Sequence, residues 1–231
     1  MTVRTITLFQ KIGAVYIAIP KVGNTSLKSE LIFFETGQQV EDPHAPDLDI
    51  ATLTPAQVTA SVRQRNFVFT FVRNPWDRLV SLWADKCGKN ANVDLARWGI
   101  EPGMPFDAFV DRVCLFRDEA SQIHFQSQTF LLMHRGRLLP SYIGRFETLK
   151  RDWHHVKRSL RINQSSRNHE LPHLLASTHK PYRDYYTREL AVKVASRYAD
   201  DAVMFLGQQR PPPARMSLRN PFDELFDHKI E

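Results

Sequence analysis

The sequence predicts an α/β fold in which a central parallel sheet is flanked by helices in three layers. Two apolar runs, residues 15–19 and 67–72, have the character of buried strands, and each precedes a loop and a segment with helical spacing. Repeated strand, loop and helix units are typical of parallel sheets, whose connecting helices cover the faces. Ligands of such sheets bind beyond the carboxyl ends of the strands, where both loops lie.

The first loop, within AVYIAIPKVGNTSL, has the composition of a phosphate cradle. It precedes a helix that we expect over residues 27–34. The first N–H groups of a helix lack intrahelical acceptors and attract anions. Gly23 permits close backbone approach, and Lys21 adds a positive charge. The motif is not an ATP-type phosphate loop, in which the lysine follows the glycines. The alternative is an ordinary turn capped by Asn24, Thr25 or Ser26.

The second loop, within RNPWDRLVS, begins at Arg73 after the strand predicted over residues 67–72. A helix is expected over residues 76–86, with Ser81 about two turns along it. A guanidinium fork and a hydroxyl together suit a phosphate monoester. The alternative is that Arg73 pairs with Asp77 and that Ser81 only packs within the helix.

The remaining elements follow from capping and apolar spacing. We expect helices over residues 55–65, 106–117, 148–160 and 187–198, and a short strand over residues 142–146. The first of these helices should begin with Thr54 as its N-cap and Pro55 at its first position. Residues 37–54, 88–105 and 161–179 read as loops, residues 122–133 mix polar and aromatic side chains, and residues 202–206 close the domain. We therefore expect one domain over residues 1–209 and a proline-rich, amphipathic tail over residues 210–231.

Composition narrows the environment and the partners. With 231 residues, 42% of them hydrophobic, the chain can bury one sizeable core. No apolar stretch reaches the roughly 18–20 residues of a membrane span, and the N-terminus lacks the pattern of a secretory signal. Only two cysteines are present, which favours a reducing, cytoplasmic location. The formal charge of +6 suggests an anionic ligand.

Four segments resemble one protein family. PKVGNTSLK and FVRNPWDRLVSLWADK are similar to the two cofactor-binding motifs of sulfotransferases that use PAPS (3′-phosphoadenosine 5′-phosphosulfate). IGRFETLKRDW and PYRDYYTRELAVKVASRYADD resemble downstream segments of the carbohydrate sulfotransferase group, which is sulfotransferase family 2-like, and of its bacterial relatives. The resemblance implies a P-loop-like fold. It also implies metal-independent transfer of a sulfuryl group to an acceptor hydroxyl, with release of adenosine 3′,5′-bisphosphate.

The resemblance also implies roles for individual residues. Lys21 would neutralise charge that develops on the bridging oxygen of the leaving 5′-phosphate. The residues that would bind the cofactor are Gly23, Asn24, Thr25, Ser26 and Leu27 at the 5′-phosphate, Arg73 and Ser81 at the 3′-phosphate, and Lys180, Tyr182 and Arg183 closing over it. For the last three, a basic surface turn is the alternative. Asn24 departs from the family pattern, which often has a small residue or a cysteine there.

The acceptor must lose a proton, so a general base is expected. His44, in EDPHAPD, is the first candidate, and His124, in QIHFQSQ, is the rival, both by resemblance to histidine-bearing regions of the family. Ordinary surface or packed histidines are the alternative for both. The acceptor itself stays open: an acidic saccharide, a lipid-linked sugar, a small alcohol or a peptide tyrosine fits equally. An oligomer is possible.

Two other functions compete with sulfuryl transfer. A nucleotide or small-molecule kinase would need the Gly-Lys-Ser/Thr loop and a Mg²⁺ carboxylate, which the sequence does not show. A non-catalytic nucleic-acid binder would use the basic charge, but the basic residues are dispersed among acidic ones without aromatic interleaving. We therefore expect no nucleic-acid partner and no stable membrane insertion.

Overall fold

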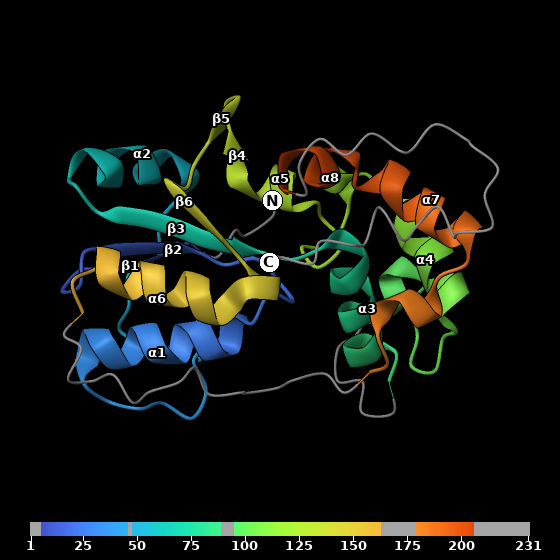
Figure 1. Ribbon diagram of the computed structural model, residues 1–231, viewed down its shortest axis with the longest axis horizontal. Coiled ribbons are helices and arrows are strands. Elements are labelled where there is room, and N and C mark those ends of the chain that lie inside the picture. Colours follow the sequence, from blue (N-terminus) through green and yellow to red (C-terminus); the bar gives the residue numbers. More distant parts are fainter. Residues whose placement is uncertain (1–5, 46–47, 89–94, 163–178, 206–231) are drawn as a thin grey trace.

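The computed structural model describes residues 6–45, 48–88, 95–162 and 179–205, and its centre is a four-stranded sheet of order β1-β2-β3-β6 (Figure 1). Its strands are β1 (Ile6–Phe9), β2 (Ala14–Ile17), β3 (Phe67–Val72) and β6 (Tyr142–Arg145). Strands β2, β3 and β6 run parallel, and β1 pairs antiparallel with β2. The mixed α/β fold with a mostly parallel central sheet is therefore confirmed.

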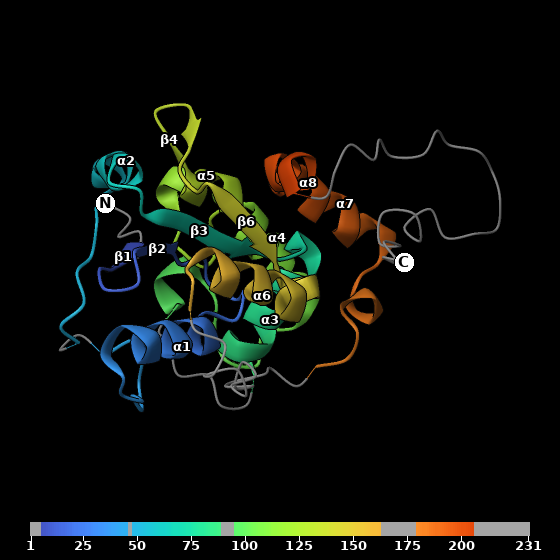
Figure 2. The same cartoon turned by 60° about the vertical axis from the view of Figure 1, so that its left-hand side comes forward.

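Helices flank this sheet on both faces (Figures 1 and 2). Helices α1 (Asn24–Thr36) and α6 (Leu149–Ser159) lie on one face, and α2 (Pro55–Arg63) and α5 (Gln128–Leu132) lie on the other. Helix α2 begins as its sequence predicts, with Thr54 in a capping box and a proline in the first turn. No helix in the described ranges is long and apolar enough to cross a membrane.

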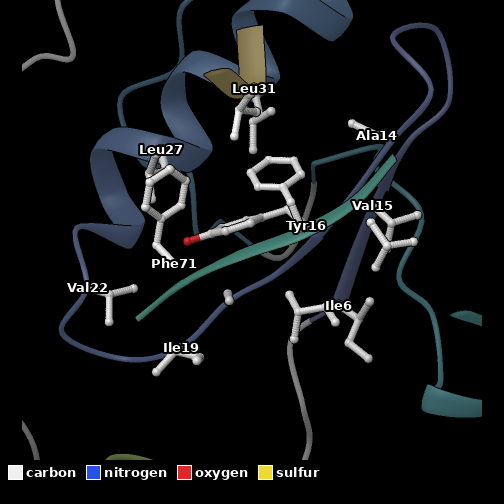
Figure 3. Packing of buried hydrophobic residues seen from close by; sticks show 14 of the residues in the cluster. Ile6, Ala14, Val15, Tyr16, Ile19, Val22, Leu27, Leu31 and Phe71 are labelled. Carbon is white, nitrogen blue, oxygen red and sulfur yellow. The ribbon is translucent and has the colours of Figure 1, made fainter. Parts of the chain in front are cut away.

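The core under the first loop is built from β2 and α1 (Figure 3). All four residues of β2 are buried, because the strand lies inside the sheet with helices on both faces. Leu27 and Leu31, one helical turn apart, pack onto the strand, and the fully buried Tyr16 points its hydroxyl toward the start of α1. Full burial of one such side chain contributes roughly 1.5–3 kcal/mol to stability, so this packing stabilises the turn between β2 and α1.

A second cluster packs beside the sheet around Trp76, Phe109 and Val194. Its helices are α3 (Pro75–Lys86), α4 (Phe106–Cys114), α7 (Arg188–Arg197) and the short η5 (Tyr182–Tyr185). Helix α8 (Ala199–Phe205) follows α7 and contacts α5. The remaining elements are η1 (Ala96–Trp98), η2 (Asp118–Ala120), η3 (Phe146–Thr148) and the two-stranded sheet of β4 (Met133–His134) and β5 (Arg137–Leu138).

Several boundaries differ from those expected. Strand β2, which was expected over residues 15–19, ends at Ile17. Helix α1 already begins at Asn24, because its N-cap is Gly23 in a left-handed conformation rather than a later polar residue. Helix α4 ends at Cys114, and the mixed segment 122–133 contains α5. The closing segment belongs to α8, which starts earlier, at Ala199. Most of the loop expected over residues 161–179 and the whole tail lie outside the described residues.

Candidate active site

The loop between β2 and α1 turns sharply through two left-handed residues, Lys21 with φ 69° and Gly23 with φ 84°. This region costs a non-glycine residue roughly 1–2 kcal/mol, so the surrounding structure holds Lys21 there. At Gly23, a Cβ would lie 3.4 Å from Phe146 Cε2 on a backbone conformation that side chains rarely adopt. The turn therefore requires glycine, and turns of this type direct successive N–H groups into a concavity suited to anions.

Helix α1 presents an open N-terminus to this concavity. No described side chain caps its first turn, and the first turn contains no acidic residue. Asn24, the first residue of the helix, accepts a hydrogen bond from the Tyr16 hydroxyl at 2.5 Å. The first N–H groups and the positive end of the helix dipole are thus available to an external anion.

Lys21 shares a carboxylate with another lysine. Its Nζ lies 3.2 Å from Asp85 Oδ2 on α3, and Lys86 Nζ lies 2.8 Å from the same oxygen. Burial lowers the pKa of Lys21, against the effect of Asp85. Burial works to raise the pKa of Asp85, but the two lysines outweigh it and lower that pKa. Two ammonium groups against one carboxylate leave excess positive charge beside the loop.

Arg73 ties the second loop to the first. It follows β3 directly, and its Nη1 donates to the carbonyl oxygen of Lys21 at 3.1 Å. Its Nε donates to Asp77 Oδ2 at 2.7 Å, so the ion pair considered from the sequence is present. The guanidinium lies 4.2 Å from the centre of the Phe146 ring, which also packs against Gly23. The Arg73 side chain therefore links the second loop to the first.

The backbone of Arg73 is held by an amide side chain. Gln128 Oε1 accepts its N–H at 2.9 Å, and Gln128 Nε2 donates to its carbonyl oxygen at 2.8 Å. Gln128 is anchored in turn by the buried Asp201 of α8, which accepts the backbone N–H groups of Gln128 at 2.9 Å and of Thr129 at 2.7 Å. This chain of contacts fixes the position at which the second loop leaves the sheet.

Ser81 is buried on the face of α3 that meets both loops. Asp77, Ser81 and Asp85 are spaced four residues apart and therefore share that face. Asp77 contacts Arg73 and Asp85 contacts Lys21, so the Ser81 hydroxyl lies on the helix between the two contacts. The structure thus brings the two sequence motifs together at one edge of the sheet.

Arg78 is a buried residue that sequence reasoning missed. Its guanidinium donates to three backbone carbonyl oxygens: Nε to Pro20 at 3.0 Å, Nη1 to Gln126 at 2.9 Å and Nη2 to His124 at 3.2 Å. It therefore fastens the first loop to the segment that carries His124. An arginine near the start of a helix normally faces solvent, so no sequence signal distinguished this one.

Both candidate bases lie near the first loop. His44 Nε2 is 3.3 Å from Thr25 Oγ1, and the His44 backbone N–H donates to Asp42 Oδ1 at 2.8 Å. Partial burial and the nearby Lys28 ammonium lower the pKa of His44, while Asp42 opposes them. The imidazole is therefore neutral at pH 7 and able to accept a proton.

His124 is more deeply placed. Its Nδ1 lies 2.6 Å from Gln122 Oε1, and because an amide oxygen only accepts, Nδ1 carries the hydrogen. Burial, reinforced by the charges of Lys86, Arg78 and Lys21, lowers the pKa of His124 to about 3. This histidine is therefore neutral over the physiological range, in a cationic environment.

The C-terminal aromatic and basic cluster is only partly at the site. Tyr182 accepts a long hydrogen bond from Asn74 Nδ2 at 3.5 Å, which places its ring beside the second loop. Lys180 and Arg183 belong to the same segment but are exposed. Tyr182 therefore contacts a residue that adjoins Arg73.

The donor set matches a ligand with two phosphates. The glycine turn and the uncapped helix suit one phosphate, and Arg73 with Ser81 suits another. The contact of Arg73 with Lys21 keeps these two positions close to each other. The cations, hydroxyls and backbone N–H groups at the site bind anionic oxygen and stabilise charge developing on it, and two carboxylates, Asp77 and Asp85, pair with the cations Arg73 and Lys21.

Comparison with known proteins gives one match. The family model described as "Sulfotransferase family" matches residues 4–206, which covers both loops and every strand of the sheet. Searches of the curated proteins and of the solved structures found no match. Because the family model spans most of the chain, the protein belongs to the sulfotransferase family.

Proposed function

We propose that this protein transfers a sulfuryl group from PAPS to an acceptor hydroxyl and releases adenosine 3′,5′-bisphosphate. Membership of the sulfotransferase family makes it a transferase of sulfuryl groups. The observation that supports PAPS as the donor is the contact between Arg73 Nη1 and the Lys21 carbonyl oxygen. It joins two anion-binding loops, as a ligand with phosphates on the 5′ and 3′ oxygens of one ribose requires.

The residues divide between the two phosphates. The 5′-phosphate takes the turn and helix start, from Gly23 to Leu27, where the backbone N–H groups converge. The 3′-phosphate takes Arg73 and Ser81, which would distinguish PAPS from ATP. Tyr182 lies beside Arg73 and borders this part of the site, while Lys180 and Arg183 are able to approach it from the exposed segment.

The chemistry follows from this placement. PAPS supplies a sulfuryl group on a good leaving phosphate. The acceptor oxygen forms a bond to sulfur, the bond from sulfur to the 5′-phosphate oxygen breaks, and its electron pair stays on that oxygen. Lys21 and the first N–H groups of α1 stabilise this negative charge without reorganising, which is the main source of catalysis in such sites.

A histidine takes the acceptor proton, and His44 is the better base. A general base works best when its pKa lies near the operating pH. The pKa of His124 is about 3, which makes it a weak base. His44 is accessible to solvent, and its Nε2 lies 3.3 Å from Thr25 Oγ1 in the first turn of α1. His124 therefore acts as a neutral hydrogen-bonding group beside Lys21. The acceptor is a hydroxyl of a saccharide or another small molecule.

The test compares ligands that differ by one phosphate. Calorimetry without Mg²⁺ would measure binding of adenosine 3′,5′-bisphosphate, 5′-AMP and ATP to wild type, Ser81→Ala and Ser61→Ala. Ser61 is a buried serine on α2 and serves as the matched control. Loss of a hydrogen bond to a charged group weakens binding by about tenfold or more. We expect that loss for the bisphosphate with Ser81→Ala alone, and no change for 5′-AMP.

Two results would count against the proposal. Equal affinity of wild type for 5′-AMP and the bisphosphate would show that the protein has no site for the 3′-phosphate. A preference for ATP that requires Mg²⁺ would indicate a kinase instead.

A further inference from the structure

Lys28 is a buried cation that the proposed chemistry does not use. It lies on α1, is only 9% exposed, and makes no hydrogen bond or ion pair with any described residue. Removing a charged side chain from water without a compensating partner is costly. Burial accordingly lowers the pKa of Lys28, and Asp42 is the one carboxylate near enough among the described residues to oppose this.

The position of Lys28 directs it to the first turn of α1. It lies three residues beyond Thr25 and four beyond Asn24, so the three side chains share one helix face. Long helical side chains lean toward the helix N-terminus, which here is the uncapped end. His44 contacts Thr25, and the Lys28 charge acts on the His44 imidazole. Lys28 thus adjoins the anion site on the side of the candidate base.

We infer that Lys28 binds the sulfuryl oxygens of the bound donor. This rests on the proposed function. The sulfuryl group is attached to the phosphate in the first turn of α1, and the acceptor must approach sulfur from the side that holds the base. His44 places that side at Thr25, next to Lys28. Lys21 is held toward Asp85 on α3, and serves the leaving oxygen instead.

The consequence is a division of labour between two lysines. During transfer the acceptor oxygen bonds to sulfur as the sulfur–phosphate oxygen bond breaks, and the proton passes to His44. The three outer oxygens stay on sulfur throughout, and Lys28 holds their negative charge. Lys28 therefore recognises the group that PAPS has and the bisphosphate product lacks.

The experiment measures that discrimination directly. Calorimetry would compare PAPS with adenosine 3′,5′-bisphosphate on wild type, Lys28→Met, Lys28→Arg and Lys157→Met, without acceptor. Lys157 is a half-buried lysine near the far end of α6 and serves as the control. Lys28→Met should weaken PAPS binding about tenfold and change bisphosphate binding less than about twofold. Lys28→Arg keeps the charge and should retain most of the preference for PAPS.

Thermal unfolding separates this role from a structural one. Because methionine needs no desolvation of a charge, Lys28→Met should raise the unfolding temperature of the ligand-free protein. A variant that is destabilised and loses both ligands equally, or one that keeps the wild-type preference for PAPS, would overturn the inference. If wild type bound neither nucleotide, the proposed function itself would fail, which is a different outcome.

Discussion

Replacement of Arg78 by methionine should be among the most damaging single changes in this protein. The guanidinium donates to the carbonyl oxygens of Pro20, His124 and Gln126, and methionine would leave all three without this donor, one of them buried and two partly buried. Each unsatisfied group costs about 1–3 kcal/mol. The loss of the buried charge recovers part of that cost, so we expect a net loss of about 3–5 kcal/mol. The free energy of unfolding of a typical domain is only about 5–15 kcal/mol.

Urea unfolding followed by circular dichroism would measure this loss. Arg112→Met is the control, because Arg112 donates through Nε to a single carbonyl oxygen, that of Trp98, and is less buried. It should cost about 1 kcal/mol. For a domain of this size, the expected loss at Arg78 corresponds to a decrease of about 6–20 °C in unfolding temperature. An Arg78→Met variant within about 1 kcal/mol of wild type would refute the view that this guanidinium joins the two segments.

Three further changes test the site. Gly23→Ala forces a side chain onto φ 84° and toward the Phe146 ring, so it should cost about 1–2 kcal/mol in urea unfolding and weaken bisphosphate binding; an unchanged affinity would contradict the cradle. Asp85→Asn removes a carboxylate whose pKa is lowered in the folded protein. Wild type should lose stability as the pH falls through that pKa, and the variant should lose less over the same pH range. The pKa of His124 is about 3 in the folded protein and about 6.5 in the unfolded chain, so as the pH falls the unfolded chain binds this proton before the folded protein does. The free energy of unfolding should therefore decrease by about 2–3 kcal/mol between pH about 6.5 and pH about 4.5. His124→Gln should make this decrease smaller, as measured by urea unfolding at several pH values.

Local signals predicted most of the sheet and its helices. The run over Phe67–Val72 is apolar except for Thr70 and bounded by polar residues, and the strand has those limits. Thr54 and Pro55 predicted the start of α2 because a hydroxyl cap and a first-turn proline act within the helix itself. Both loops could be placed at one edge of the sheet because parallel strands align their carboxyl ends.

Features that depend on distant contacts escaped prediction. Strand β1 is a short edge strand of four residues that is defined by pairing with β2, which its own sequence does not reveal. Helix α5 has two of its first N–H groups satisfied by Asp201, a residue far along the chain. The predicted start of α1 was wrong because three residues that resemble caps lie inside the helix, after a left-handed glycine. The burial of Arg78 and Lys28 likewise follows only from the packed structure.

The amide of Gln128 extends β3 by one residue. By accepting the N–H of Arg73 and donating to its carbonyl oxygen, it makes both hydrogen bonds that a neighbouring strand would make. Arg73 lies past the end of the strand, yet its backbone N–H should exchange with deuterium as slowly as those within the sheet. Since Gln128 is itself anchored by Asp201, the last described helix governs how rigidly the second loop is presented. Mutations at the C-terminal end of the fold would therefore loosen the site without touching it.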